Sequence, residues 1–256
     1  MRFSDKIVLI TGAAGGIGIA AAKAFAKEGA KLALVDLSKE ALEKATSSMT
    51  TEDVLLLTAN VANEDEVKRY VEETVNHYGR IDVFINNAGI NGKFANLVDQ
   101  TAENFQAVFN VNVMGVFYGL KHVLKTMKEQ KSGAIVNTAS NGGLLGSPGM
   151  GPYIASKHAV IGLNKTAALE AVEYGIRVNA VAPSGVDTAM MKSIETNAMP
   201  GKEQEAREQF ESTVPMKRYA TPEEIAQLML FLASDQASFL TGSYYRIDGG
   251  QGANSV

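Results

Sequence analysis

Short apolar runs alternate with longer segments of helical periodicity along the chain. The short runs are rich in Val, Ile and Leu and contain few polar residues, which is typical of strands covered on both faces of a sheet. Seven such runs occupy residues 6–11, 31–36, 53–59, 82–89, 133–140, 176–183 and 244–250. The longer segments lie near residues 17–28, 39–48, 64–78, 101–130, 153–174 and 222–233. This alternation predicts βαβ units and a parallel sheet.

No Pro-, Gly- or Ser-rich linker divides the chain, and no repeat or low-complexity tract interrupts it. We therefore predict a single α/β domain over residues 1–256. Its expected fold is doubly wound (Rossmann-type), with a seven-stranded parallel sheet and helices on both faces. The last predicted helix has a clear start, because Thr221 can cap it, Pro222 suits its first position and Glu224 completes a capping box.

Residues 184–220 break the alternation between the sixth strand and this capped helix. The segment carries four methionines, at positions 190, 191, 199 and 216. A long excursion within a compact domain is often functional, so we predict a substrate-binding lid there. Helices that merely cover the end of the sheet are the alternative.

Composition and charge exclude several classes of protein and site. The net charge of -4 and the absence of a Lys/Arg-rich stripe argue against a nucleic-acid partner. The chain has no cysteine, which rules out disulfides and thiolate chemistry, and its three histidines form no metal-binding pair, so no metal is expected. No apolar run approaches the roughly 18 residues of a membrane span. We expect a cytoplasmic protein that does not enter a membrane.

The first predicted strand ends in a glycine-rich turn, "TGAAGGIGIA", over residues 11–20. Glycines at such a turn let the backbone approach a pyrophosphate, and the following helix offers free N–H groups. Asp36 ends the second strand, 18 residues after Gly18. A carboxylate there can accept hydrogen bonds from the adenosine ribose and repel a 2′-phosphate, which favours NAD over NADP. The alternative is that Asp36 only opens the next helix.

Tyr153 and Lys157 are four residues apart in "YIASK" and share one face of a predicted helix. A nearby ammonium favours the phenolate and so lowers the pKa of the phenol, which can then exchange a proton with an alcohol or carbonyl oxygen. Ser140, at the end of the fifth strand, would face the same crevice and hold that oxygen. A solvated helix face is the simpler interpretation of the Tyr–Lys pair taken alone.

Several motifs together resemble the short-chain dehydrogenase/reductase family, in its branch of about 250 residues. They are "TGAAGGIG" (11–18), "NNAG" (86–89), Asn112, Ser140, "YIASK" (153–157) and "IDGG" (247–250), and their order and spacing match over essentially the whole chain. The resemblance implies that Tyr153 is the general acid/base, that Lys157 lowers its pKa and binds the nicotinamide ribose, and that Ser140 orients the substrate. Asn112 would support a water-linked proton path from the lysine. A packing role is the alternative for Asn112.

The resemblance also implies the cofactor contacts. In addition to Tyr153 and Lys157, they are Gly12, Gly16, Ile17, Gly18, Asp36, Leu37, Asn60, Val61, Asn87, Ala88, Gly89, Pro183, Val186 and Thr188. Two positions depart from the pattern. Asn60 stands where the family usually has an aspartate, and Ser184 where it usually has a glycine.

The sequence leaves the substrate open. Gly142, Leu144, Leu145, Met150, Met190 and Met191 suggest an apolar pocket. We expect an NAD-dependent oxidoreductase that interconverts a secondary alcohol and a ketone, with an NADPH-preferring 3-oxoacyl thioester reductase as the alternative. A protein that senses NAD without turnover is the rival from another class. By analogy with the family, helices near 101–130 and 153–174 would pair subunits into a homotetramer or homodimer.

Overall fold

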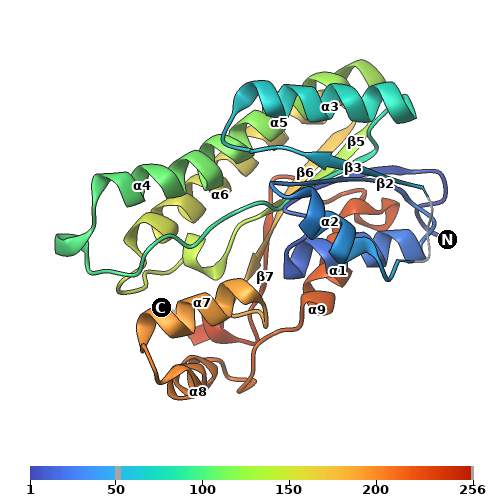
Figure 1. Cartoon of the computed structure of the whole chain (residues 1–256). Helices are drawn as coiled ribbons and strands as arrows, with labels where there is room; N and C mark the ends of the chain where they lie inside the picture. Colours follow the sequence, from blue (N-terminus) through green and yellow to red (C-terminus); the bar gives the residue numbers. More distant parts are fainter. Residues whose placement is uncertain (50–52, 255–256) are drawn as a thin grey trace.

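The computed structural model describes residues 1–49 and 53–254, and its centre is one parallel sheet (Figure 1). The strand order is β3-β2-β1-β4-β5-β6-β7. The strands are β1 (Ile7–Thr11), β2 (Lys31–Asp36), β3 (Val54–Thr58), β4 (Val83–Asn86), β5 (Gly133–Thr138), β6 (Ile176–Pro183) and β7 (Tyr244–Ile247). All seven predicted strands are therefore confirmed, as is the doubly wound topology.

Successive residues along each strand face opposite sides of the sheet, and each side is covered by its own layer of helices. Leu9 pairs with Phe84 and belongs to a core cluster with residues of α3 (Glu64–Tyr78), α5 (Gly115–Gln130) and α6 (Gly151–Ala171). The next row, at Ile10 and Ile85, belongs to the cluster formed with α1 (Gly16–Lys27), α2 (Lys39–Thr46) and α9 (Pro222–Ala233). Because both faces are buried, the strands read as continuous apolar runs. Figure 1 shows these two layers on either side of the sheet.

The helix predicted over 101–130 is interrupted. It consists of α4 (Ala102–Phe109), a π-helical turn (Asn110–Met114) and α5, which follow one another without a loop. Such π turns insert an extra residue into the helical ladder and occur often at functional sites. Asn112 lies in this turn and is fully buried.

The predicted lid segment holds two helices, α7 (Ala189–Ala198) and α8 (Glu203–Thr213). It leaves the carboxyl end of β6 at Pro183 and returns to α9, which begins with the predicted capping box: Thr221 accepts from the Glu224 backbone N–H, and Glu224 accepts from that of Thr221. Short 3-10 turns complete the structure at Leu97–Asp99, Asn141–Gly143, Val172–Tyr174, Asp235–Ala237 and Gln251–Asn254.

Within the described residues, the stretch Ala102–Gln130 is long and apolar enough, by length and composition alone, to cross a membrane. In this structure 44% of its most apolar window is buried, and α5 packs against α3 and α6. A helix in a protein core has the same composition, so the stretch does not by itself indicate a membrane span.

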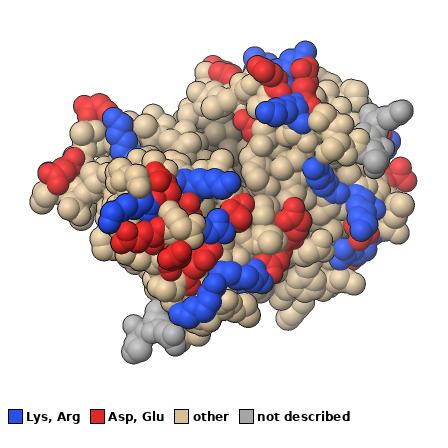
Figure 2. All heavy atoms as spheres, turned by 60° about the horizontal axis from the view of Figure 1, so that its bottom comes forward, with Lys and Arg blue, Asp and Glu red and all other residues tan. Residues whose placement is uncertain are grey.

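On the face drawn in Figure 2, charged side chains of both signs are interspersed.

Candidate active site

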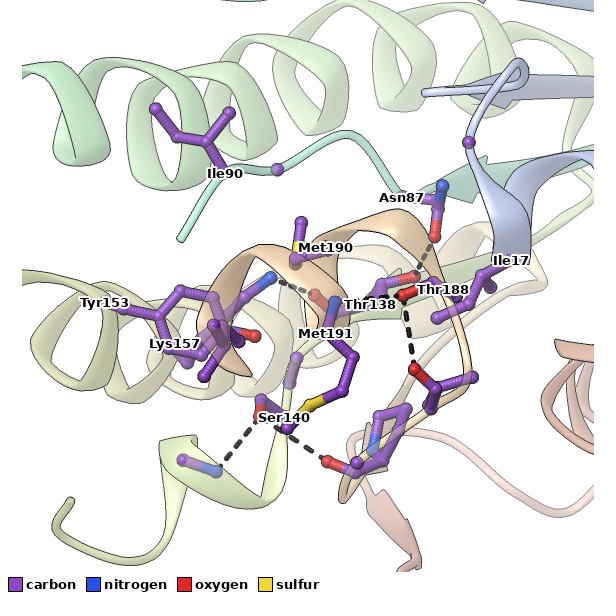
Figure 3. A pocket seen from close by; sticks show the side chains of 18 of the residues that line it. Ile17, Asn87, Ile90, Thr138, Ser140, Tyr153, Lys157, Thr188, Met190 and Met191 are labelled. Carbon is purple, nitrogen blue, oxygen red and sulfur yellow. Dashed lines mark hydrogen bonds between the residues drawn. The ribbon is translucent and has the colours of Figure 1, made fainter. Parts of the chain in front are cut away.

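A cavity of about 680 Å³ opens at the carboxyl ends of the strands, where the order reverses between β1 and β4. This switch point is where open α/β sheets bind their ligands. Its wall is formed by the β1–α1 turn, the ends of β4, β5 and β6, and helices α6, α7 and α8. Figure 3 labels cavity residues from α1, α6 and α7 and from the ends of β4 and β5.

Two glycines of the glycine loop have no room for a side chain. Gly12 has a φ of +64°, and a Cβ there would lie 2.9 Å from the Cα of Ala88. At Gly16 a Cβ would lie 2.6 Å from the Thr188 methyl carbon. The N-cap of α1 is Gly15, so no side chain caps this helix. The first N–H groups of α1 therefore stand at the cavity as a cradle that suits a phosphate.

Asn87 and Thr11 join the loop after β4 to the glycine loop. The Thr11 hydroxyl accepts from the backbone N–H groups of Asn87 and Ala88, at 3.0 and 3.2 Å. The Asn87 amide donates to the carbonyls of Thr11 and Gly12. Two strand ends that form the floor of the cavity are thus fixed to each other.

Asp36 does not cap the helix that follows it. Ser38 is the N-cap of α2 and accepts from the backbone N–H of Ala41. The Asp36 carboxylate instead accepts from Ala14 N at 2.9 Å and from Leu37 N at 2.8 Å. It lines the cavity beside the glycine loop. Each carboxylate oxygen has a further acceptor site, so a ribose diol fits this position.

Tyr153 and Lys157 lie near the beginning of α6, and Ser140 follows β5. The Lys157 ammonium is buried and donates to the Thr138 carbonyl at 2.8 Å. It lies 5.6 Å from the centre of the Tyr153 ring. The Ser140 hydroxyl accepts from Gly142 N at 3.0 Å and donates to the Pro183 carbonyl at 3.4 Å. The three side chains predicted to act together therefore line one cavity (Figure 3).

Burial perturbs both titratable groups of this set. It raises the pKa of the Tyr153 phenol, and the polar contact with the Ser140 side chain opposes that shift. Burial lowers the pKa of Lys157 from 10.5 to about 8. The ammonium is near enough to the ring to favour the phenolate, but burial and Ser140, rather than Lys157, set the shift of the phenol's pKa in this structure.

Asn112 links the loop after β4 to α6. Its amide oxygen accepts from Ile90 N at 2.8 Å, and its amide nitrogen donates to the Ile90 carbonyl and to the Ser156 hydroxyl. Gly89 lies between Asn112 and Lys157: a Cβ there would be 3.2 Å from the Asn112 oxygen and 3.5 Å from the lysine nitrogen. The π turn thus places an amide beside the buried ammonium.

Most predicted cofactor and substrate residues line the cavity. They are Gly12, Gly16, Ile17, Asp36, Leu37, Asn60, Val61, Asn87, Ala88, Gly89, Pro183, Val186 and Thr188 on the cofactor side, and Gly142, Leu145, Met150, Met190 and Met191 on the substrate side. Two residues differ from the prediction. Gly18 packs against the Gly12 carbonyl instead of lining the cavity, and Leu144 packs against the core cluster of α5 and α6.

The two departures from the family pattern cause no strain. The Asn60 amide oxygen accepts from Ala62 N and has a second lone pair. Ser184 is not among the residues with positive φ, so its Cβ needs no unusual backbone.

Several cavity residues were missed by the sequence interpretation: Ile90, Ser147, Ile194, Phe210, Thr213, Val214, Tyr219 and Gln251. Three of them, Phe210, Thr213 and Val214, lie at the end of α8 or just after it, within the segment predicted as a lid. Gln251 follows "IDGG" and had no local signal, because only tertiary packing brings it to the cavity.

Comparison with known proteins gives closely similar relatives over nearly the full chain. The family model described as "Enoyl-(Acyl carrier protein) reductase" matches residues 12–251. Levodione reductase of Leifsonia aquatica is 46% identical, over 98% of this chain and 96% of its own. A 3-oxoacyl-[acyl-carrier-protein] reductase of Thermotoga maritima is also 46% identical, over 98% of this chain and 99% of its own.

Solved structures agree with this result. The crystal structure of levodione reductase superimposes with a TM-score of 0.97 at 44% identity, covering 99% of this chain and 100% of that one. NAD+-bound xylitol dehydrogenase gives a TM-score of 0.93 at 37% identity, covering 98% and 100%. A 3-ketoacyl-(acyl-carrier-protein) reductase from Brucella melitensis complexed with NADH gives 0.89 at 32% identity, covering 97% and 98%.

The burial of Lys157 leads to a prediction about how the stability of the fold depends on pH. Because its pKa in the folded protein is depressed to about 8, the ammonium destabilises the fold below pH 8, and this cost fades as pH rises toward the unfolded value of 10.5. Urea unfolding should therefore show wild type gaining stability relative to Lys157→Met between about pH 8 and 10. Lys125→Met, at an exposed lysine of α5, is the control and should show no such trend. A Lys157→Met difference that is constant with pH would contradict the burial of a charged amine.

Proposed function

The chain belongs to the short-chain dehydrogenase/reductase family, and from this we propose that it is an NAD-dependent oxidoreductase that interconverts a secondary alcohol and a ketone. One observation carries the proposal: Ser140, Tyr153 and Lys157 line the same cavity as the uncapped glycine loop. A proton-transfer group and a dinucleotide cradle within one cavity are what such a reaction requires.

The glycine loop fits the pyrophosphate of the cofactor, and Asp36 fits the adenosine ribose. The carboxylate would accept from the ribose hydroxyls, whereas a 2′-phosphate would meet its negative charge. Two similar solved structures, one bound to NAD+ and one complexed with NADH, support this choice. When bound, NAD supplies the nicotinamide ring that accepts the hydride from the carbinol carbon of the substrate.

The chain's own residues would handle the proton and the oxygen. Ser140 holds the substrate oxygen, and Tyr153 takes the hydroxyl proton in oxidation or returns it in reduction. Below about pH 8 Lys157 carries a positive charge, which favours the phenolate form of Tyr153 during oxidation of the alcohol. Asn112 and the Gly89 backbone beside the lysine would support the path by which the proton leaves.

A second candidate is reduction of a 3-oxoacyl thioester. The Thermotoga relative that is 46% identical has this activity in its name, and the Brucella reductase of that class was solved with NADH. A preference for NAD that is set by Asp36 therefore does not by itself argue against a 3-oxoacyl thioester reductase. Turnover of acetoacetyl-CoA with NADH at a kcat/KM above that of any simple ketone would favour it over our first choice.

We also propose a cytoplasmic homotetramer or homodimer. Exposed aromatic side chains at Phe105 and Phe117 mark α4 and α5 as one candidate interface. Leu169, Val172 and Phe239 are further exposed apolar side chains. Exposed apolar groups of this kind commonly mark contacts between proteins.

Replacing Tyr153 by Phe removes the proton-transferring hydroxyl and keeps the ring. Turnover of a secondary alcohol, followed by nicotinamide absorbance, should fall by about 10²-fold or more, since general acid–base catalysis contributes that much. NAD affinity, measured by calorimetry, should stay within about threefold of wild type because the glycine loop is untouched. Tyr174→Phe, outside the cavity, is the matched control. Near-wild-type turnover by Tyr153→Phe would remove this residue from the mechanism.

Replacing Asp36 by Ala removes the acceptor for the ribose and the charge that opposes a 2′-phosphate. The ratio of kcat/KM with NAD to that with NADP should fall by about tenfold, the effect of losing a charge-assisted hydrogen bond. Stability should also fall, because Ala14 N and Leu37 N lose their acceptor. Asp65→Ala, on α3, is the control. A loss of stability with an unchanged cofactor ratio would assign Asp36 to loop structure alone.

A further inference from the structure

Glu195 is a buried carboxylate that the proposed reaction does not use. It lies on α7 and is 5% exposed, and its Oε1 has no hydrogen-bond partner among the described residues. Arg207, on α8, pairs with two other acids, and no ion pair in the described part of the chain includes Glu195. A charge buried without an ion pair is costly, so its presence calls for an explanation.

The Glu195 carboxylate faces the phenol of Tyr219, which lines the cavity. Burial raises the pKa of the Tyr219 phenol, and the adjacent Glu195 carboxylate raises it further, although the two groups form no hydrogen bond of ordinary geometry. Tyr219 is 4% exposed, and a Cβ at Gly185 would lie 2.7 Å from its ring. Gly185 comes two residues after Pro183, whose carbonyl accepts from Ser140. Glu195 therefore lies one side chain behind the cavity wall, near the strand end that Ser140 contacts.

The charged groups around the Tyr219 ring do not balance. The guanidinium carbon of Arg207 lies 4.9 Å from the centre of the ring. This guanidinium is bonded to Glu211 at 2.9 Å and to Asp187 at 3.4 Å, so one cation is already shared between two acids. Beyond burial, Glu195 and Glu211 raise the pKa of the Tyr219 phenol, and Arg207 opposes them. The protein behind this part of the wall thus carries an excess of negative charge.

Apart from Lys157, the described residues present no cation to the cavity. The Lys157 ammonium is buried and donates to the Thr138 carbonyl, and in the proposed reaction it serves the Tyr153 phenol. Outside the wall, Arg218 is paired with Glu224. Much of the wall on the substrate side is apolar and consists of Leu145, Met150, Met191, Ile194, Phe210 and Val214. A carboxylate bound there would lose its hydration without gaining a counter-charge.

We propose that Glu195 is a specificity-determining residue that excludes anions, so that the substrate is an uncharged alcohol or ketone. This rests on the proposed function. An anion at the apolar wall loses its hydration and also meets the field of Glu195, whereas an uncharged substrate meets neither cost. Because the carboxylate and Tyr219 are both buried, water and salt screen this field only weakly. Hydroxy acids, 3-oxo acids and sugar phosphates are thereby excluded, and carbocyclic and aliphatic alcohols are accepted.

The test compares an anionic ketone with its uncharged ester. The substrates 4-oxocyclohexanecarboxylate and its methyl ester are reduced with NADH at neutral pH, with cyclohexanone as the reference. Wild type should prefer the ester by about 10²-fold in kcat/KM, because the acid must lose its hydration against the apolar wall. The ester is the larger molecule, so a steric effect would favour the acid. If the ring ester does not fit, methyl acetoacetate and acetoacetate form the same comparison.

Two variants with opposite effects on charge separate an electrostatic role from a structural one. Glu195→Gln keeps the shape of the side chain and removes its charge, so the ester-to-acid ratio should fall by about tenfold, the size of one charge–charge interaction inside a protein. Arg207→Met removes the cation that offsets the acids, so the ratio should rise, by about threefold because this arginine is partly exposed. Glu208→Gln, at an exposed glutamate of α8, is the control and should keep the wild-type ratio.

Damage to the packing of α7 or α8 would impair the turnover of ester and acid alike and leave their ratio unchanged. An unchanged ratio in Glu195→Gln, or shifts in the same direction in both variants, would overturn the role of Glu195. If Glu195→Gln does not fold, an Arg207→Met ratio that fails to rise would overturn it. Wild type that reduces acid and ester equally well would also overturn it and leave the proposed function intact. If wild type reduces none of these ketones and oxidises no secondary alcohol, the proposed function itself fails.

Discussion

The hydrogen bond from the buried Lys157 ammonium to the Thr138 carbonyl is the contact on which the site depends. A charged amine inside a protein is tolerated only with a hydrogen-bond partner, and here the partner is the last residue of β5. The bond joins the first turns of α6, which carry Tyr153, to the end of β5, which Ser140 follows. The same burial lowers the pKa of the lysine to about 8, so its charge responds to pH near neutrality.

The other half of the site depends on backbone segments that approach one another closely. Gly12 and Gly16 let the β1–α1 turn pack directly against the loop after β4 and against Thr188. Asn87 and Thr11 hold that loop in place with hydrogen bonds between side chain and backbone. Asp36 is held by Ala14 N of the same turn. The glycine loop and the Tyr153 phenol thus share one cavity, and α7 and α8 form part of its wall.

The fold and the polar centre of the site could be predicted, because both leave local patterns in the sequence. Continuous apolar runs marked every strand, and "YIASK" placed Tyr153 and Lys157 on one helix face. The π turn at Asn110–Met114 could not be predicted, since one inserted residue hardly changes the hydrophobic periodicity. The packing of Leu144 against the core and the position of Gln251 at the cavity depend on contacts between segments distant in sequence, about which local pattern says nothing.

The most direct test of the account follows the transferred hydrogen. Wild-type protein is given NAD and a secondary alcohol deuterated at its carbinol carbon, and the reduced cofactor is examined by NMR. We predict one deuterium at C4 of the nicotinamide ring for each ketone formed. Reduced cofactor without deuterium, or no reduction of bound NAD by any alcohol or of any ketone by NADH, would contradict it.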